Sequence, residues 1–189
     1  MTYRLKVIIF AAVILVGVGA GFFILRPSQK ESAPSSNPNN PKVTEQGEIP
    51  AEDFSYQKPK DWATLSKEAL DPHDAVSGMS RIAAPAASFT VKVSSSTPKS
   101  DDELKNSTLD DIKKNASNFE LISSGATNID NHAGQKFTYK YGSGNKTKQE
   151  LSVIVYKQKT FFLLFTAAEA DFDKQQADFD KILSDFKFN

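Results

Sequence analysis

The stretch 135–166 reads QKFTYKYGSGNKTKQELSVIVYKQKTFFLLFT, and it decides the fold class of the chain. Its first seven residues alternate between polar side chains and the aromatic rings of Phe137, Tyr139 and Tyr141, as expected of a strand with one buried face. Its run FFLLF at 161–165 is apolar on both faces, which predicts a central strand covered on each side. Turn-forming residues separate the strands. The stretch therefore predicts an antiparallel meander.

Helical patterns flank this meander in the sequence. Residues 100–103 read SDDE, a capping box, and apolar or small side chains then recur at helical spacing as far as Ala116. A second helix is expected over about 171–184, where Phe172 and Phe179 belong to its inner stripe. Long antiparallel stretches with segregated helices predict an α+β sandwich.

The composition narrows the classes of function. The 189 residues include 23 basic and 23 acidic side chains, so no bulk electric field favours nucleic acid as a partner. There is no cysteine, which excludes disulfides, thiolate metal sites and a lipidated N-terminal cysteine. No P-loop, HExxH or EF-hand pattern occurs, and we expect no cofactor.

The N-terminal segment has the length and composition of a membrane anchor. From Val7 to Leu25 it carries no charged side chain, and as a helix it would reach roughly 28 Å, close to the thickness of a bilayer's hydrocarbon core. Arg4 and Lys6 precede it, which favours a cytoplasmic N-terminus and a single-pass protein of the cell membrane. A cleaved signal peptide ending near 18–20 is the alternative, although the apolar residues beyond that point favour an uncleaved anchor.

The chain therefore divides into three parts. Residues 1–26 are expected to form the transmembrane anchor. Residues 27–53 are rich in proline, serine and asparagine and hold too little apolar surface to form a core, so we expect a disordered linker. Residues 54–189 are expected to form one extracytoplasmic domain.

Three landmarks in this domain resemble the PsbP-like superfamily. They are the opening Phe54-Ser-Tyr56 followed by Pro59 and Trp62, the segment 130–134 (DNHAG) ahead of the aromatic strand, and the ending 172–188, which contains FDK twice. The resemblance covers residues 54–189 and extends to bacterial PsbP-related members that stand behind an N-terminal anchor.

This resemblance implies a fold and a type of function. The fold would be a central antiparallel β-sheet flanked by helices on both faces, an α/β/α sandwich. The function would be binding or assembly without catalysis. For an anchored domain of this kind, we expect the partner to be a neighbouring envelope protein, the cell surface or a small ligand. If the organism is photosynthetic, the resemblance also allows an extrinsic photosystem II subunit of the PsbP type.

Charge distribution suggests a candidate partner surface. Residues 135–160 hold six lysines and one acid, whereas 169–189 carry a net charge of −3. One interpretation is a surface for anionic lipid headgroups or an acidic partner. The other is that edge and hairpin lysines deter strand-to-strand aggregation. The candidate residues are Trp62, Lys136, Lys140, Lys146, Lys148, Lys157 and Lys159.

The two histidines are the starting point for an enzyme interpretation. His73 lies between Asp71 and Asp74, which could contribute to a metal site, and His132 lies in an expected turn. A metal-dependent or hydrolytic envelope enzyme that uses either histidine is therefore a further alternative. No serine occupies a GxSxG elbow, and we expect a polar loop and a surface turn, with no catalytic or metal-binding residue.

Overall fold

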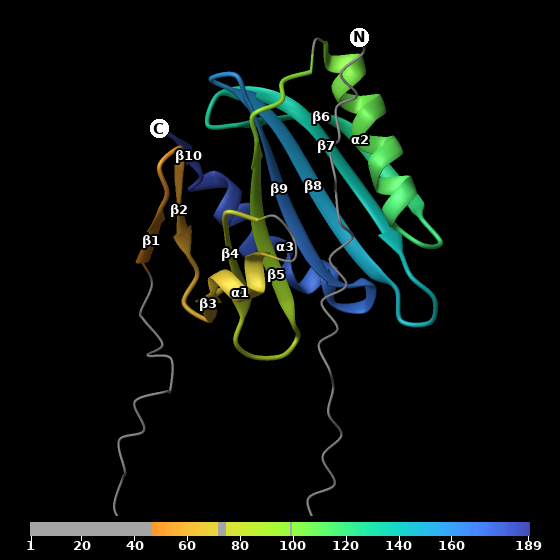
Figure 1. Cartoon of the computed structure of the whole chain (residues 1–189). Coiled ribbons are helices and arrows are strands. Elements are labelled where there is room, and N and C mark those ends of the chain that lie inside the picture. Colours follow the sequence, from red (N-terminus) through yellow and green to blue (C-terminus); the bar gives the residue numbers. More distant parts are fainter. Residues whose placement is uncertain (1–46, 72–74, 99) are drawn as a thin grey trace, which may run out of the picture.

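Figure 1 shows the fold in a computed structural model that describes residues 47–71, 75–98 and 100–189, with side chains described from residue 51. A seven-stranded antiparallel sheet is its central element, in the order β3-β4-β5-β9-β8-β7-β6. The predicted meander is confirmed, and β9 lies between β5 and β8 as a central strand. The strands are β3 (Trp62–Thr64), β4 (Ser77–Arg81), β5 (Ala87–Ser94), β6 (Glu120–Ile129), β7 (His132–Tyr141), β8 (Thr147–Tyr156) and β9 (Lys159–Ala168).

A smaller sheet and three helices complete the described region. The small sheet is antiparallel, in the order β1-β2-β10, and consists of β1 (Gly47–Pro50), β2 (Phe54–Lys58) and β10 (Lys187–Phe188). The helices are α1 (Lys67–Leu70), α2 (Asp101–Asn115) and α3 (Glu169–Ser184). Strand β10 pairs with β2, so the small sheet joins residues from the two ends of the described chain.

Each face of the large sheet buries its own apolar cluster. On one face, aromatic rings of β2, β5, β9 and α3 form the larger cluster, in which Phe165 stacks on Phe179 at a centroid distance of 4.6 Å. On the other face, Leu104 and Ile112 of α2 pack against apolar side chains of β7, β8 and β9. Full burial of one such side chain contributes about 1.5–3 kcal/mol, so both clusters stabilise the fold.

The expected α+β sandwich with helical layers on both faces of the sheet is wrong. The described region is mostly strand, and one of its three helices is a single turn. On the side of α3, the outer layer includes the small sheet, whose Phe54 and Tyr56 lie in the same cluster as the residues of α3. The short strands β1 and β10 carry too little sequence pattern to reveal a second sheet, and the resemblance suggested helices in that place.

Local features of the elements follow from the sequence. The capping serine is confirmed, because Ser100 Oγ accepts a hydrogen bond from the Glu103 N–H at 3.2 Å. Strand β6 has ten residues and runs through Gly125 without a break. Its pairing with β7 shifts by one residue between Leu121 and Ser123, which marks a β-bulge.

No helix within the described residues is long and apolar enough to cross a bilayer. The expected anchor from Val7 to Leu25 and the linker as far as residue 46 lie outside the described residues. Strand β1 falls within the range 27–53 that was expected to be a linker, and it pairs with β2 from Gly47 to Pro50. The folded part of the chain therefore begins before Phe54.

Candidate binding surface

Trp62, one of the candidate partner residues, belongs to the core. Its side chain is fully buried, and its ring lies 6.5 Å from that of Phe165. The indole N–H donates to Asp178 Oδ2 of α3 at 3.2 Å, which ties β3 to that helix. Burial of the ring and its hydrogen bond leave Trp62 no surface for a partner, so its role is structural.

The six candidate lysines are all paired within the described fold. Near one end of the sheet, Lys140 and Lys146 pair with Glu120, Lys140 also pairs with Glu169, and Lys148 pairs with Asp173 at 2.9 Å. Halfway along β7, Lys136 pairs with Glu150 at 3.5 Å. At the other end, Lys159 pairs with Asp53 at 2.7 Å, and Lys157 donates to the carbonyl oxygen of Asn189 at 2.8 Å.

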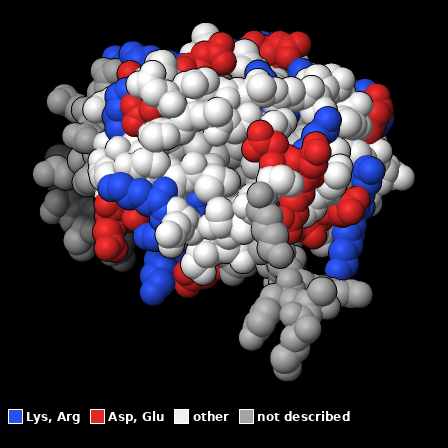
Figure 2. All heavy atoms as spheres, turned by 90° about the horizontal axis from the view of Figure 1, so that it is seen from above, with Lys and Arg blue, Asp and Glu red and all other residues white. Residues whose placement is uncertain are grey.

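These ion pairs bring together lysines and acids that lie in different parts of the sequence. The lysine-rich hairpins meet acids from α3, from the start of β6 and from the loop before β2. Figure 2, which views the molecule from above, shows basic and acidic groups beside one another around a largely uncharged surface. Exposed pairs of this kind contribute only about 0–1 kcal/mol each, so their main effect is to neutralise the local field. The lysines therefore do not form a continuous cationic face for anionic lipid.

His132 is the first residue of β7, and its expected place in a surface turn is wrong. The turn consists of Asp130 and Asn131, whose φ values are 50° and 64°. The His132 ring is half-buried, 4.6 Å from the Tyr156 ring and 5.3 Å from the Phe188 ring. The neighbouring Asp130 accepts hydrogen bonds from Lys187 and from the Phe188 N–H, and these bonds lower the pKa of its carboxyl. His132 thus packs the C-terminal strand.

Metal-binding geometry is absent among the described residues, where no three histidine or acidic side chains cluster as metal ligands. His73 and its neighbours at 72–74 lie outside the described residues.

A row of buried polar side chains crosses the face of the sheet on which α2 packs. Register places Tyr139 of β7 opposite Gln149 of β8, Gln149 opposite Thr166 of β9, and Thr166 opposite Ser88 of β5. Directly paired residues point to the same face of a sheet, so these four side chains stand in line. All four are less than a tenth exposed. We call them the polar row.

One atom of the polar row lacks a partner within the described structure. Gln149 donates from Nε2 to Thr166 Oγ1 at 2.8 Å, but its acceptor Oε1 is buried without a hydrogen-bond partner among the described residues. A buried orphan acceptor costs about 1–3 kcal/mol. Burial also raises the pKa of the Tyr139 hydroxyl far above its usual value, with a smaller contribution from Tyr141, so Tyr139 stays a neutral donor and acceptor.

The sheet beside the polar row is only half covered. Leu104 and Ile112 of α2 cover β7 and β8, while Leu65 and Leu70, at the start and end of the α1 segment, lie over Gly78 of β4. Between the two helices, three side chains of β5 and β9 are half-buried. They are Thr90, Lys92 and Leu164, which we call the inter-helix strip.

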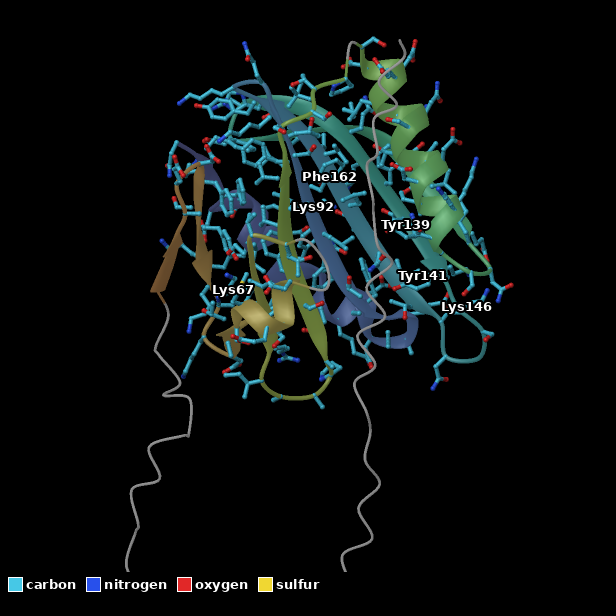
Figure 3. All side chains as sticks on the ribbon, viewed as in Figure 1. Lys67, Lys92, Tyr139, Tyr141, Lys146 and Phe162 are labelled. Atoms are coloured by element: carbon cyan, nitrogen blue, oxygen red, sulfur yellow. The ribbon has the colours of Figure 1, made fainter. Side chains whose placement is uncertain are left out.

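Figure 3 shows this arrangement from the front. Lys92 and Phe162 lie near the middle of the sheet, between Lys67 of α1 and the pair Tyr139 and Tyr141 beside α2. Lys92 also lies within electrostatic range of Asp111 of α2, whose pKa is raised mainly by burial. The strip and the polar row beside it thus place hydroxyl, amide and ammonium groups next to the apolar side chains of this face.

Sequence reasoning missed this surface. Gln149 and Thr166 each stand two residues from an apolar side chain of the same face, Leu151 in β8 and Leu164 in β9, and that contrast is the available signal. It was not interpreted because the register that aligns these residues across four strands depends on the hairpin turns and on the pairing of β5 with β9. The lysines were singled out by their number, yet most of them point to acids that lie far away in the sequence.

The two sheets, the single long helix on each face and the half-covered strip define an antiparallel-sheet domain. A family model described as PsbP-like protein matches residues 7–188, so the chain belongs to the PsbP-like family. The expected superfamily is thereby confirmed. No curated protein sequence matches the chain.

Solved structures of similar fold come from organisms that are unlike one another, two bacteria and a yeast. The cyanobacterial PsbP (CyanoP) of Synechocystis sp. PCC 6803 is 16% identical, with a TM-score of 0.60 over 84% of this chain and 98% of that chain. The Ran-binding protein Mog1p of Saccharomyces cerevisiae is 8% identical, with a TM-score of 0.52 over 75% and 94%. LpqN of Mycobacterium tuberculosis is 14% identical, with a TM-score of 0.50 over 77% and 91%. At these identities the similarity shows the fold alone.

Proposed function

We propose that this protein is a membrane-anchored, extracytoplasmic module that binds or assembles with an envelope protein and does not catalyse a reaction. The anchor from Val7 to Leu25 would hold the domain at the membrane surface, and the linker would let it reach a neighbour. Family membership supports a PsbP-like domain in this role.

The observation that carries the proposal is the unpartnered acceptor of Gln149 on β8, beside the inter-helix strip. A free protein gains nothing from burying Gln149 Oε1 without a donor, because the same position filled by an apolar side chain would avoid the cost. A site that exchanges hydrogen bonds with a partner retains such groups at the expense of stability. A partner whose main-chain or amide N–H enters between the strip and α2, next to Thr166, would supply the missing donor.

The names of similar structures are compatible with this type of role. One is described as a Ran-binding protein and another as involved in cell envelope biogenesis. Proteins of this architecture are therefore named for Ran binding in one case and for cell envelope biogenesis in another. For the present chain, the partner is argued from the strip and not from these names.

The test is photo-crosslinking from the strip in intact cells that produce the full chain. A photoreactive amino acid replaces Thr90, which is half-buried in the strip, and, as a control, Lys181, which is exposed on α3. We expect a discrete adduct with an envelope protein from position 90 and none from position 181. Equal adducts from both positions, or none from position 90, would contradict the proposal.

A matched variant links the adduct to the orphan acceptor. The double substitution Gln149→Met and Thr166→Val removes the acceptor together with its internal hydrogen-bond partner, so no new orphan remains. We expect the crosslink from position 90 to fall about fivefold to tenfold, the effect of one hydrogen bond. The free protein should become about 1 kcal/mol more stable in urea denaturation. An unchanged crosslink with raised stability would show that the acceptor serves no partner.

A further inference from the structure

We propose that strand β6 pairs with β6 of a second copy of this chain, antiparallel and about a two-fold axis at Ala126. Strand β6 forms the outer edge of the large sheet (Figure 1), and this edge is separate from the inter-helix strip.

Beyond the bulge at its start, strand β6 is a long edge that no lysine, proline or covering segment protects among the described residues. Of its ten residues, eight are exposed, Thr127 is half-buried and Ile129 is buried. From Leu121 to Ile129 it contains no charged residue and no proline. The opposite edge strand, β3, has only three residues. Proteins normally guard long edges with lysine, proline or a covering segment, because an open row of N–H and C=O groups recruits another strand.

The alternation of hydrogen bonds between β6 and β7 shows which main-chain groups of β6 are not bonded to β7. The two-residue turn formed by Asp130 and Asn131, with positive φ at both, is closed by the directly paired Ile129 and His132. In such a hairpin, the closing pair is hydrogen-bonded, and hydrogen-bonded pairs then alternate with non-bonded pairs. The residues between the hydrogen-bonded pairs, taken in steps of two back from residue 128, direct their main-chain N–H and C=O groups away from β7. They are Ser124, Ala126 and Asn128.

These three residues are related by symmetry about Ala126. If Ala126 faces Ala126 of the second copy, Ser124 faces Asn128 of the second copy, and Asn128 faces Ser124 of the second copy. Each of the three pairs is then a hydrogen-bonded pair, because all six residues direct their main-chain groups outward. The register therefore uses every outward N–H and C=O between residues 124 and 128.

The side chains of β6 favour a second copy over a charged partner. Exposed Ala126 meets its own small side chain at the axis, and Ser124 meets the amide of Asn128. No like charges face each other, since the segment 121–129 is neutral. Helix α2 does not bury the strand, because Ser124, Ala126 and Asn128 are all exposed. Leu121 and Ile122, 40% and 48% exposed, would approach the turn of the second copy.

One strand pair buries less surface than the roughly 1,600 Å² of a standard interface, so the contact is weak in dilute solution. Confinement of two copies to one membrane would raise their effective concentration. This last point rests on the proposed function, and the register does not.

The test is disulfide mapping, for which the cysteine-free chain provides a clean background. The full chain is oxidised mildly in its native membrane. Ala126→Cys should form a covalent dimer, because hydrogen-bonded partners have Cα atoms about 5.5 Å apart, within the range of a disulfide. Ser124→Cys and Asn128→Cys should each remain monomeric alone, since identical positions lie roughly 13 Å apart. Co-produced, these two variants should crosslink to each other.

The controls distinguish strand pairing from random collision and from misfolding of a variant. Lys113→Cys, exposed on α2, measures random encounters, and we expect Ala126→Cys to exceed it at least tenfold. Ala126→Lys places like charges on the axis and should abolish the crosslink between Ser124→Cys and Asn128→Cys. Circular dichroism verifies that each variant is folded.

Two outcomes would overturn the proposal. One is crosslinking of Ala126→Cys at the level of Lys113→Cys, and the other is a crosslink from Ala126→Cys to a different protein in place of a second copy. The result is also independent of the strip. Loss of β6 crosslinking with an intact adduct from position 90 refutes only the self-pairing, whereas the reverse result refutes only the proposed function.

Discussion

The two faces of the large sheet are built differently. The face toward α3 and the small sheet packs aromatic rings against one another, with Phe165 in contact with Trp62, Phe172 and Phe179. The face toward α2 has a smaller cluster, a buried polar row and a half-covered strip between helices. The contrast teaches that one face provides most of the stability, while the other can retain groups that are costly in the free protein.

Neighbouring residues of β9 give the largest contrast between the two faces. Phe165 points to the aromatic face and is fully buried, whereas Leu164 points to the strip and is half-buried. We expect Phe165→Ala to lower the free energy of unfolding by about 3–5 kcal/mol through the cavity it leaves. Leu164→Ala should lower it by about 1 kcal/mol, because a half-buried side chain removes less apolar surface from water. Urea denaturation of the full chain in detergent measures both, and equal losses would break the comparison.

Two glycines of the β6–β7 hairpin test how tightly the aromatic side is packed. A Cβ on Gly134 would lie 2.3 Å from Ile154 Cδ1 and 2.3 Å from the Val153 carbonyl oxygen, whereas a Cβ on Gly125 would meet nothing within 4 Å. We expect Gly134→Ala to cost about 1–3 kcal/mol, since the neighbouring backbone must move. Gly125→Ala should change stability by less than about 0.5 kcal/mol. Thermal unfolding compares the two variants, and a neutral Gly134→Ala would indicate looser packing.

Buried tyrosines give the smallest expected effect at neutral pH. Burial raises the pKa of Tyr56 on the aromatic face to about 12, and burial raises that of Tyr141 on the α2 face to about 12. Because the folded state holds these protons more tightly, their contribution to stability is complete below about pH 10 and is lost as the pH rises through 12.

We therefore expect Tyr56→Phe and Tyr141→Phe to flatten the loss of stability between pH 10 and 12. At pH 7, Tyr56→Phe should cost only about 1 kcal/mol, from its hydrogen bond with Ser77. Urea midpoints at several pH values measure the slope. If only Tyr141→Phe changed the slope, burial would not raise the pKa of Tyr56 as expected.

Sequence patterns predicted the elements that are long and periodic. The alternation at Phe137, Tyr139 and Tyr141 and the run at 161–165 determined the meander, and the SDDE motif determined the start of α2. These signals are local, because each depends on residues within one or two turns or on one strand. Phe172 and Phe179 of the predicted inner stripe of α3 are buried, and Gln175 is buried beside them.

The remaining features depend on contacts between distant segments. The small sheet requires β2 to meet both β1 and β10, which lie at opposite ends of the described chain. The polar row requires a register across four strands, which no single window contains. The ion pairs of Lys148 and Lys159 join residues 25 and 106 positions apart, so a charge count along the chain could not foresee them.

The small sheet also has a mechanical consequence. A pull on the chain that precedes Gly47 would first load the pairing of β1 with β2. The C-terminal residue fastens the turn between these strands, since the Asn189 N–H donates to the Asp53 carbonyl oxygen at 2.9 Å and Asn189 Nδ2 donates to that of Ala51 at 3.2 Å. Tension that enters at one end of the fold is therefore resisted by the hydrogen bonds of Asn189 at the other end. The strength of these bonds would set the force at which the domain begins to unfold.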